Sequence, residues 1–152
     1  MGGEMRPRIL IVDDHEIVRE GVRGLIRRSR PDWEISGEAT NGQDAIEAVK
    51  KLRPDVVVLD ITMPVMSGLE ASSLIAGLDP RPRILMFTMH ESDRLSTEVR
   101  QAKAQGYVLK SQAARNLIRA IEQLLTGGEF FGPEPGPGQF GGPPAPVSMT
   151  QR

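Results

Sequence analysis

The stretch VVVLD, residues 56–60, constrains the fold of this chain more than any other, because an apolar run ends there on a carboxylate. An unbroken apolar run is typical of a parallel strand that helices cover on both faces, since a strand with one face in water alternates apolar and polar residues. Pro64 disfavours helix at the preceding residue and keeps the chain open after Asp60. We therefore expect a buried strand that carries an acidic side chain at its end.

Short apolar and β-branched runs alternate with amphipathic stretches along most of the chain. The runs predict strands at 8–12, 33–39, 55–59, 83–88 and 107–109. The amphipathic stretches predict helices around 18–25, around 45–52, from 67 onward, about 91–105 and around 117–124. The fourth helix has the sparsest apolar stripe, formed by Leu95, Val99 and Ala102.

Two of these helices have recognisable starts. Asn41 is an expected N-cap, and Ser67 with Glu70 matches a capping box.

Five strands alternating with five helices favour a doubly wound α/β fold with a parallel sheet. The flavodoxin-like strand order 2-1-3-4-5 is the common five-strand solution, and we adopt it, although periodicity alone does not separate it from other orders.

Composition narrows the classes of function. The net charge of -1 gives no electrostatic signature of nucleic-acid binding. The chain has no cysteine, which excludes disulfides and thiolate chemistry and fits a reducing compartment. No apolar run reaches the length of a signal peptide or a membrane span. We expect a soluble, cytoplasmic protein that does not associate with membranes.

The composition changes near the end of the chain. Between Gly132 and Val147, eleven of sixteen residues are Gly or Pro. Such a segment buries too little apolar surface to offset its ordering entropy, so residues 132–147 are interpreted as a linker or tail. A PxxP-type recognition sequence at 143–146 is the less favoured alternative.

Polar residues follow several of the predicted strands. The first strand runs into Asp13 and Asp14, and the third ends on Asp60. The fourth strand ends on Thr88, and the fifth runs into Lys110. In the expected strand order these ends meet where the order reverses, which is where ligands bind in open α/β sheets.

Clustered carboxylates repel one another unless a cation offsets their charge. Oxygen ligands without cysteine or clustered histidine favour Mg²⁺ over Zn²⁺, and a carboxylate beside Mg²⁺ can form an aspartyl-phosphate. Each residue alone also has a structural interpretation, because an Asp at a strand end often caps a turn. His15 and His90 are expected to be exposed residues of a loop or helix start. The joint placement on four strands favours a functional site.

Four segments in order, "ILIVDDHEIVREGV", "VVVLDITMPVMSG", "MFTMHES" and "GYVLK", resemble the receiver domain of two-component response regulators. The resemblance covers residues 8–131 and is closest to the subgroup that carries a C-terminal LuxR-like helix-turn-helix. It implies a CheY-like fold, a phosphorylation-activated signalling role rather than an enzyme, and a sensor histidine kinase as partner.

The resemblance also implies roles for individual residues. Asp60 would be the phosphoacceptor. Mg²⁺ would be bound by Asp14, Asp60 and the backbone carbonyl of Thr62, with Asp13 in support.

Thr88 and Lys110 would contact the phosphoryl group, and Tyr107 would be the switch aromatic. The helix 4, strand 5, helix 5 face, about 91–125, would be the surface that changes on activation. A homodimer on activation fits this role.

Some positions depart from the family pattern. Ser111 replaces the proline that often follows the lysine, so we expect a trans peptide bond after Lys110. Lys103 stands where small residues are usual. The last residues, SMTQR at 148–152, resemble the opening of the LuxR-like DNA-binding module, so DNA binding is expected only through an output domain that this chain lacks.

Two alternatives remain open from the sequence. One is a stand-alone or phosphorylation-independent interaction module. The other is a phosphatase that uses an aspartyl-phosphate, like the haloacid dehalogenase group, but Thr62 is a poor general acid at the position where such enzymes need one.

Overall fold

The computed structural model describes residues 6–131, and in them strands and helices alternate throughout. The strands are β1 Arg8–Val12, β2 Glu34–Ala39, β3 Val56–Asp60, β4 Arg83–Thr88 and β5 Gly106–Leu109. The helices are α1 Glu16–Ser29, α2 Gly42–Leu52, α3 Gly68–Ile75, α4 Leu95–Gln101 and α5 Ala113–Leu125, with a short 3₁₀ turn, Lys110–Gln112, before α5.

The five strands form one parallel sheet in the order β2-β1-β3-β4-β5. This confirms the predicted flavodoxin-like order. The order reverses between β1 and β3, which pair along Ile9–Val12 and Val56–Leu59. The carboxyl ends of these two strands therefore lie side by side at the position where the sequence predicts a site.

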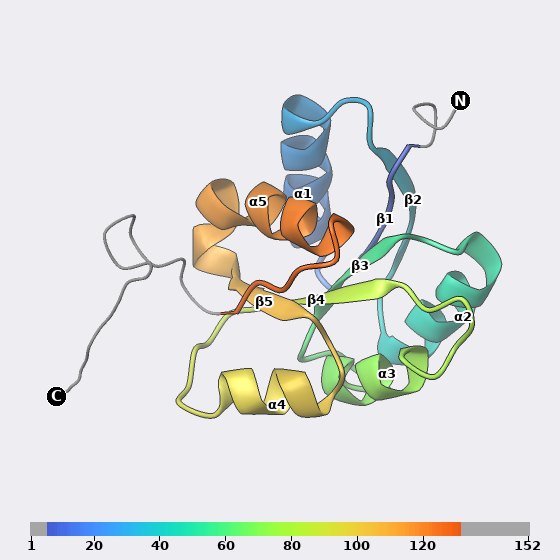
Figure 1. The fold of residues 1–152 in the computed structure, drawn as a ribbon, viewed down its shortest axis with the longest axis vertical. Coiled ribbons are helices and arrows are strands. Elements are labelled where there is room, and N and C mark those ends of the chain that lie inside the picture. Colours follow the sequence, from blue (N-terminus) through green and yellow to red (C-terminus); the bar gives the residue numbers. More distant parts are fainter. Residues whose placement is uncertain (1–5, 132–152) are drawn as a thin grey trace, which may run out of the picture.

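Two helical layers cover the sheet. Figure 1 shows α1 and α5 on one side, and α2, α3 and α4 on the other. Successive residues of β3 enter opposite cores: Val57 joins the core under α2 and α3, and Val58 joins the core under α1 and α5. Burial on both faces explains why this strand is apolar at consecutive positions.

The predicted helix starts are confirmed. The side chain of Asn41 caps α2 by accepting a hydrogen bond from the Asp44 N–H at 2.9 Å. Ser67 caps α3 by accepting from the Glu70 N–H at 3.2 Å. Each cap satisfies one of the N–H groups that the first helical turn leaves unpaired.

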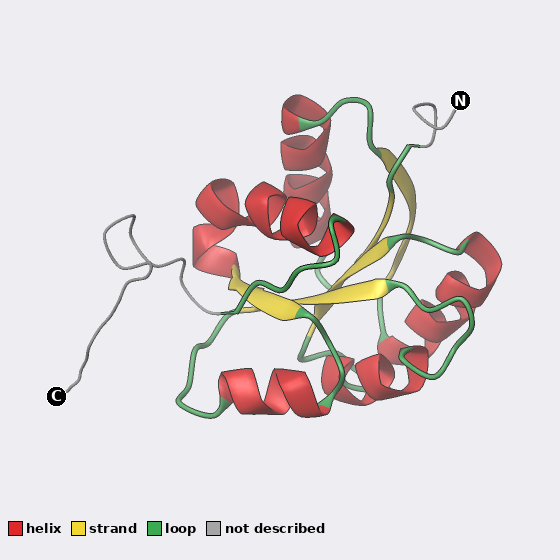
Figure 2. Cartoon of the chain, in the orientation of Figure 1, coloured by secondary structure: helices red, strands yellow, loops and turns green. Residues whose placement is uncertain are grey.

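The fourth helix is shorter than the 91–105 predicted from the sequence. Figure 2 shows a long loop between β4 and α4, and the helix itself covers only Leu95–Gln101. Leu95 and Val99 are its buried residues, too few to hold a longer helix on the sheet. Lys103 follows with φ 67°, in the left-handed region that favours glycine, which accounts for the small residues usual at this turn.

The peptide bond after Lys110 is trans as predicted, since Asp79–Pro80 is the one cis bond among residues 6–131. Within the same residues, no helix is both long enough and apolar enough to cross a membrane. The predicted linker, 132–147, and the predicted start of a DNA-binding module, 148–152, lie outside the described residues.

Candidate functional site

A pocket of about 250 Å³ opens at the carboxyl edge of the sheet, beyond the ends of β1, β3, β4 and β5. Its lining comes from the ends of these strands and the loops that follow them. The lining residues are Asp14, His15, Asp60, Thr62, Thr88, Met89, His90 and Lys110.

Asp60 is the last residue of β3 and is only 4% exposed. The Thr62 N–H donates to its Oδ1 at 3.4 Å. Gly68 packs directly against the Asp60 backbone, and a Cβ on Gly68 would lie 2.0 Å from the Asp60 carbonyl oxygen. The loop that leaves β3 closes back on itself, because the Gly68 N–H donates to the Ile61 carbonyl at 2.7 Å. The strand and this closed loop hold the carboxylate at the pocket wall.

The acidic pair after β1 faces Asp60 across the edge where the strand order reverses. Asp13 is 1% exposed, whereas Asp14 is exposed. The His15 N–H donates to Asp13 Oδ1 at 2.9 Å, and His15 Nδ1 lies 3.2 Å from Asp14 Oδ1. One ligand atom from each of Asp13, Asp14, His15 and Asp60 falls within 4.8 Å of the others.

Lys110 is the cation of this group. It follows β5 directly, and its Nζ lies 2.7 Å from Asp13 Oδ2 and 3.4 Å from Asp60 Oδ1. The ammonium group lies 5.8 Å from the centre of the Phe87 ring, at cation–π distance. One lysine thus bridges the carboxylates of two neighbouring strands.

Burial in the first place, and the negative charge of Asp13 in the second, raise the pKa of Asp60 from 3.8 to about 6. The charge of Lys110 and the hydrogen bond from Thr62 act in the opposite direction but do not cancel the rise. The carboxylate is therefore held in a position where a positive charge would stabilise its ionised form.

The donor set fits a hard divalent cation. Asp13 Oδ2 accepts no hydrogen bond of suitable geometry from residues 6–131, although the Lys110 ammonium lies 2.7 Å away. A buried carboxylate oxygen with unused lone pairs, beside the carboxylates of Asp14 and Asp60, matches the oxygen coordination that Mg²⁺ prefers.

Three other residues singled out in the sequence take different positions. Thr88 ends β4, is 8% exposed and lines the pocket. Thr62 also lines the pocket and is exposed. Tyr107 lies outside the pocket lining, on β5, where it is 3% exposed and its hydroxyl donates to Glu91 Oε2 at 3.4 Å. Burial raises the pKa of the Tyr107 hydroxyl.

Sequence reasoning gave little weight to three residues that line the pocket. His15 and His90 are exposed, as expected, but both face the site. Met89 is 66% exposed and was not anticipated. Met89 directly follows the polar end of a buried strand. This position could have indicated that its side chain lies at the carboxyl edge of the sheet.

Fold and site together define a doubly wound α/β domain with a buried aspartate at the switch point of its sheet. Residues 9–122 match the family described as "Response regulator receiver domain", so the chain belongs to the response regulator receiver domain family.

Its relatives include proteins named response regulators and transcriptional regulatory proteins. Transcriptional regulatory protein LnrK of Bacillus subtilis (strain 168) is 38% identical over 127 residues, which are 84% of this chain and 57% of LnrK. Response regulator UvrY of Escherichia coli (strain K12) is 36% identical over 123 residues, covering 81% of this chain and 56% of UvrY. The chain thus spans just over half the length of these relatives.

Solved structures share the fold. A two-component response regulator of the LuxR family from Aurantimonas sp. SI85-9A1 superposes with a TM-score of 0.78 at 41% identity, covering 83% of this chain and 89% of that chain. The isolated receiver domain of RcsB from Salmonella enterica serovar Typhimurium, solved with the phosphomimetic BeF3-, gives a TM-score of 0.75 at 26% identity and covers 84% of this chain and 94% of that one.

Proposed function

We propose that Asp60 is the phosphoacceptor of this receiver domain. The observation that carries the proposal is its position: a nearly buried carboxylate at the end of the central strand, 3.4 Å from Lys110, in a pocket open to an incoming phosphodonor. Burial and the charge of Asp13 raise its pKa to about 6, so at neutral pH the carboxylate is mostly ionised and can act as a nucleophile.

The proposed reaction transfers a phosphoryl group from a phosphohistidine of a sensor histidine kinase, or from a small acyl phosphate. An oxygen of Asp60 forms the new O–P bond while the P–N bond of the phosphohistidine breaks, and the electron pair of that bond passes to the histidine nitrogen. Lys110 and Thr88 line the same pocket and would bind the phosphoryl oxygens, through charge and through a donated hydrogen bond.

The same pocket would hold Mg²⁺. The ligands would be the carboxylates of Asp14 and Asp60 and the backbone carbonyl of Thr62, with Asp13 in support. When bound, the ion would offset the negative charge of the carboxylates and the phosphoryl group.

Regulation of transcription is proposed by analogy with relatives that are named transcriptional regulatory proteins. One RcsB structure is described as two dimers bound to DNA. For this chain we propose that phosphorylation changes the face formed by α4, β5 and α5, that activation favours a homodimer, and that DNA is bound through an output domain outside the receiver fold.

Incubation with Mg²⁺ and acetyl phosphate tests the phosphoacceptor role. Intact-mass measurement should show a gain of one phosphoryl group in the wild type and none in Asp60→Asn. Asp32→Asn, which removes an exposed carboxylate away from the pocket, is the matched control and should be phosphorylated normally.

A mass gain that persists in Asp60→Asn would contradict the assignment of the acceptor. Steady turnover of a simple phosphomonoester above the level of Asp60→Asn would instead favour the phosphatase alternative. Self-association that is equal with and without beryllofluoride would favour a phosphorylation-independent module.

A further inference from the structure

The last four described residues, Gly128–Phe131, form what we call the edge strap. After α5 the chain turns back and runs beside the free edge of β5, as Figure 1 shows in red. The Tyr107 N–H donates to the Phe130 carbonyl at 2.8 Å, and the Phe130 N–H donates to the Gln105 carbonyl at 3.0 Å. These two bonds make a parallel bridge between Gly106 and Phe130, so the strap acts as a minimal sixth strand.

The two aromatic residues of the strap lie on opposite faces of the sheet. Phe130 is 8% exposed and belongs to the core under α1 and α5. Phe131 is half-buried and packs against the core that includes Tyr107 on the other face. The strap thus closes the edge of β5 on both sides.

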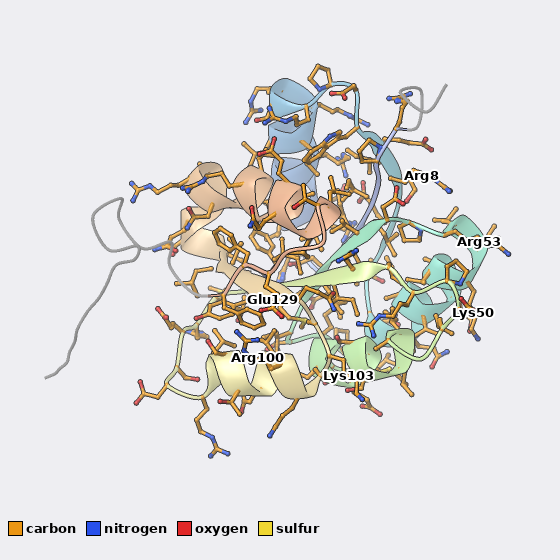
Figure 3. The ribbon with its side chains drawn as sticks, viewed as in Figure 1. Arg8, Lys50, Arg53, Arg100, Lys103 and Glu129 are labelled. Carbon is orange, nitrogen blue, oxygen red and sulfur yellow. The ribbon has the colours of Figure 1, made fainter. Side chains whose placement is uncertain are left out.

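Phe131 is held between a tyrosine and an arginine. Its ring meets the Tyr107 ring edge-to-face, with the centroids 6.2 Å apart. The Arg100 guanidinium lies 3.7 Å from the centre of the Phe131 ring and also pairs with Glu129 at 3.2 Å. Figure 3 shows Arg100 and Glu129 facing each other between α4 and the segment after α5. The strap is therefore attached to α4 as well as to β5.

Tyr107 also connects the strap to the pocket. Its hydroxyl donates to Glu91 Oε2 at 3.4 Å. Glu91 directly follows Thr88, Met89 and His90, all of which line the pocket. A shift of this loop toward a phosphoryl group on Asp60 would remove the partner of a nearly buried hydroxyl. The Tyr107 ring would then have to turn, and the edge-to-face contact with Phe131 would be lost.

We propose that the edge strap is a releasable element held by Tyr107, and that phosphorylation of Asp60 loosens it from β5. The proposal rests on the phosphoacceptor function of Asp60 proposed above. It adds a physical route from the pocket to the strap, and the strap itself lies outside residues 9–122, the part that matches the family.

Hydrogen exchange of two single amides, read by NMR on the full chain, tests the strap. The Tyr107 and Phe130 N–H groups are the donors of the bridge, so release should speed their exchange about tenfold on adding beryllofluoride to protein in Mg²⁺, the effect expected for losing the aromatic and cation–π contacts. Amides of β1 and β3 should be unchanged, and Asp60→Asn should show no response.

Two variants make the test independent of the ligand. Phe131→Leu should speed exchange of the Phe130 amide about threefold or more without beryllofluoride and reduce the further response to it. Arg100→Ala should do the same more weakly, whereas Arg115→Ala, at an exposed arginine of α5, should leave both amides unchanged.

The ¹⁹F signal of bound fluoroberyllate separates the two proposals. A bound signal with unchanged Tyr107 and Phe130 exchange would overturn the strap and leave the phosphoacceptor function standing. A lack of any Asp60-dependent bound signal would count against the phosphoacceptor function and, with it, the coupling. Equal exchange in Phe131→Leu and the wild type would also overturn the strap.

Discussion

The two helices that flank β5 are held in very different ways. α5 has thirteen residues and buries five of them, Asn116, Leu117, Ala120, Ile121 and Leu124. α4 has seven residues and buries two, Leu95 and Val99. Neither helix has a side-chain hydrogen bond at its N-cap, so the difference lies in packing and not in capping. Because α4 has fewer buried contacts to lose, it can shift at a smaller cost in free energy, as the proposed change of the α4, β5 and α5 face requires.

Matched leucine truncations are the strongest test of this contrast. Leu117 in α5 is 0% exposed and Leu95 in α4 is 3% exposed. Leu117→Ala should lower the free energy of unfolding by about 4 kcal/mol, and Leu95→Ala by about 2 kcal/mol, since a short, loosely held helix can relax into the cavity. Urea denaturation at neutral pH measures both. Equal losses would show that the two helices contribute alike and would break the comparison.

A second test distinguishes a loss of folding stability that arises at the pocket from one that arises in α4. The pKa of Asp60 is raised from 3.8 to about 6 in the folded state, so the folded protein keeps this proton to higher pH than the unfolded chain. The raised pKa of Asp60 therefore has no effect on stability below about pH 4. It lowers stability as the pH rises from about 4 to about 6, and the full loss is present above that.

Asp60→Asn should accordingly raise the free energy of unfolding by about 2–3 kcal/mol at pH 7.5, and by almost nothing at pH 3.5. The comparison is made in EDTA, so that no divalent cation offsets the charge. Leu95→Ala is the control, because its loss involves no titrating group and should be the same at pH 3.5 and pH 7.5. A gain in Asp60→Asn that does not depend on pH would contradict the raised pKa.

The smallest expected effects come from a pair of glycines, one at the edge where the strap joins α4 to β5. A Cβ on Gly106 would lie 2.0 Å from the Phe130 carbonyl oxygen, so Gly106→Ala should displace the strap and cost about 1–2 kcal/mol. A Cβ on Gly21, within α1, would meet no other atom within 4 Å, and Gly21→Ala should stabilise by about 0.5–1 kcal/mol.

Thermal unfolding of the two glycine variants, together with exchange of the Phe130 amide, measures this pair. A Gly106→Ala protein with wild-type stability and a slowly exchanging Phe130 amide would show that the strap does not depend on the close approach at this glycine. Such a result would also argue against the strap as the element that attaches α4 to β5.

The features that the sequence predicted well are local or follow from strand order. Apolar runs such as 56–60 located the strands, and the alternation with helices led to the observed order. Asp60 and Lys110 were singled out because polar residues at strand ends meet at one edge of a parallel sheet. Asn41 and Ser67 were identified as caps because capping depends on a few neighbouring residues.

The features that escaped prediction depend on contacts distant along the chain. The short extent of α4 is set by how few of its residues reach the core, which periodicity alone overstates. The bridge between Gly106 and Phe130 joins residues 24 positions apart and leaves no local pattern. The hydrogen bond from Tyr107 to Glu91 could not be predicted either, because nothing in the sequence around one residue points to the other as its partner.

Because of the edge strap, it matters whether the length of the chain between α5 and Phe130 changes by an odd or an even number of residues. Phe130 and Phe131 belong to opposite faces of the sheet, and neighbouring side chains along an extended segment alternate between faces. Inserting one residue before Glu129 would exchange the two rings between the cores, whereas inserting two would restore each ring to its own side. Any domain joined beyond the strap would therefore respond to an odd change in length differently from an even one.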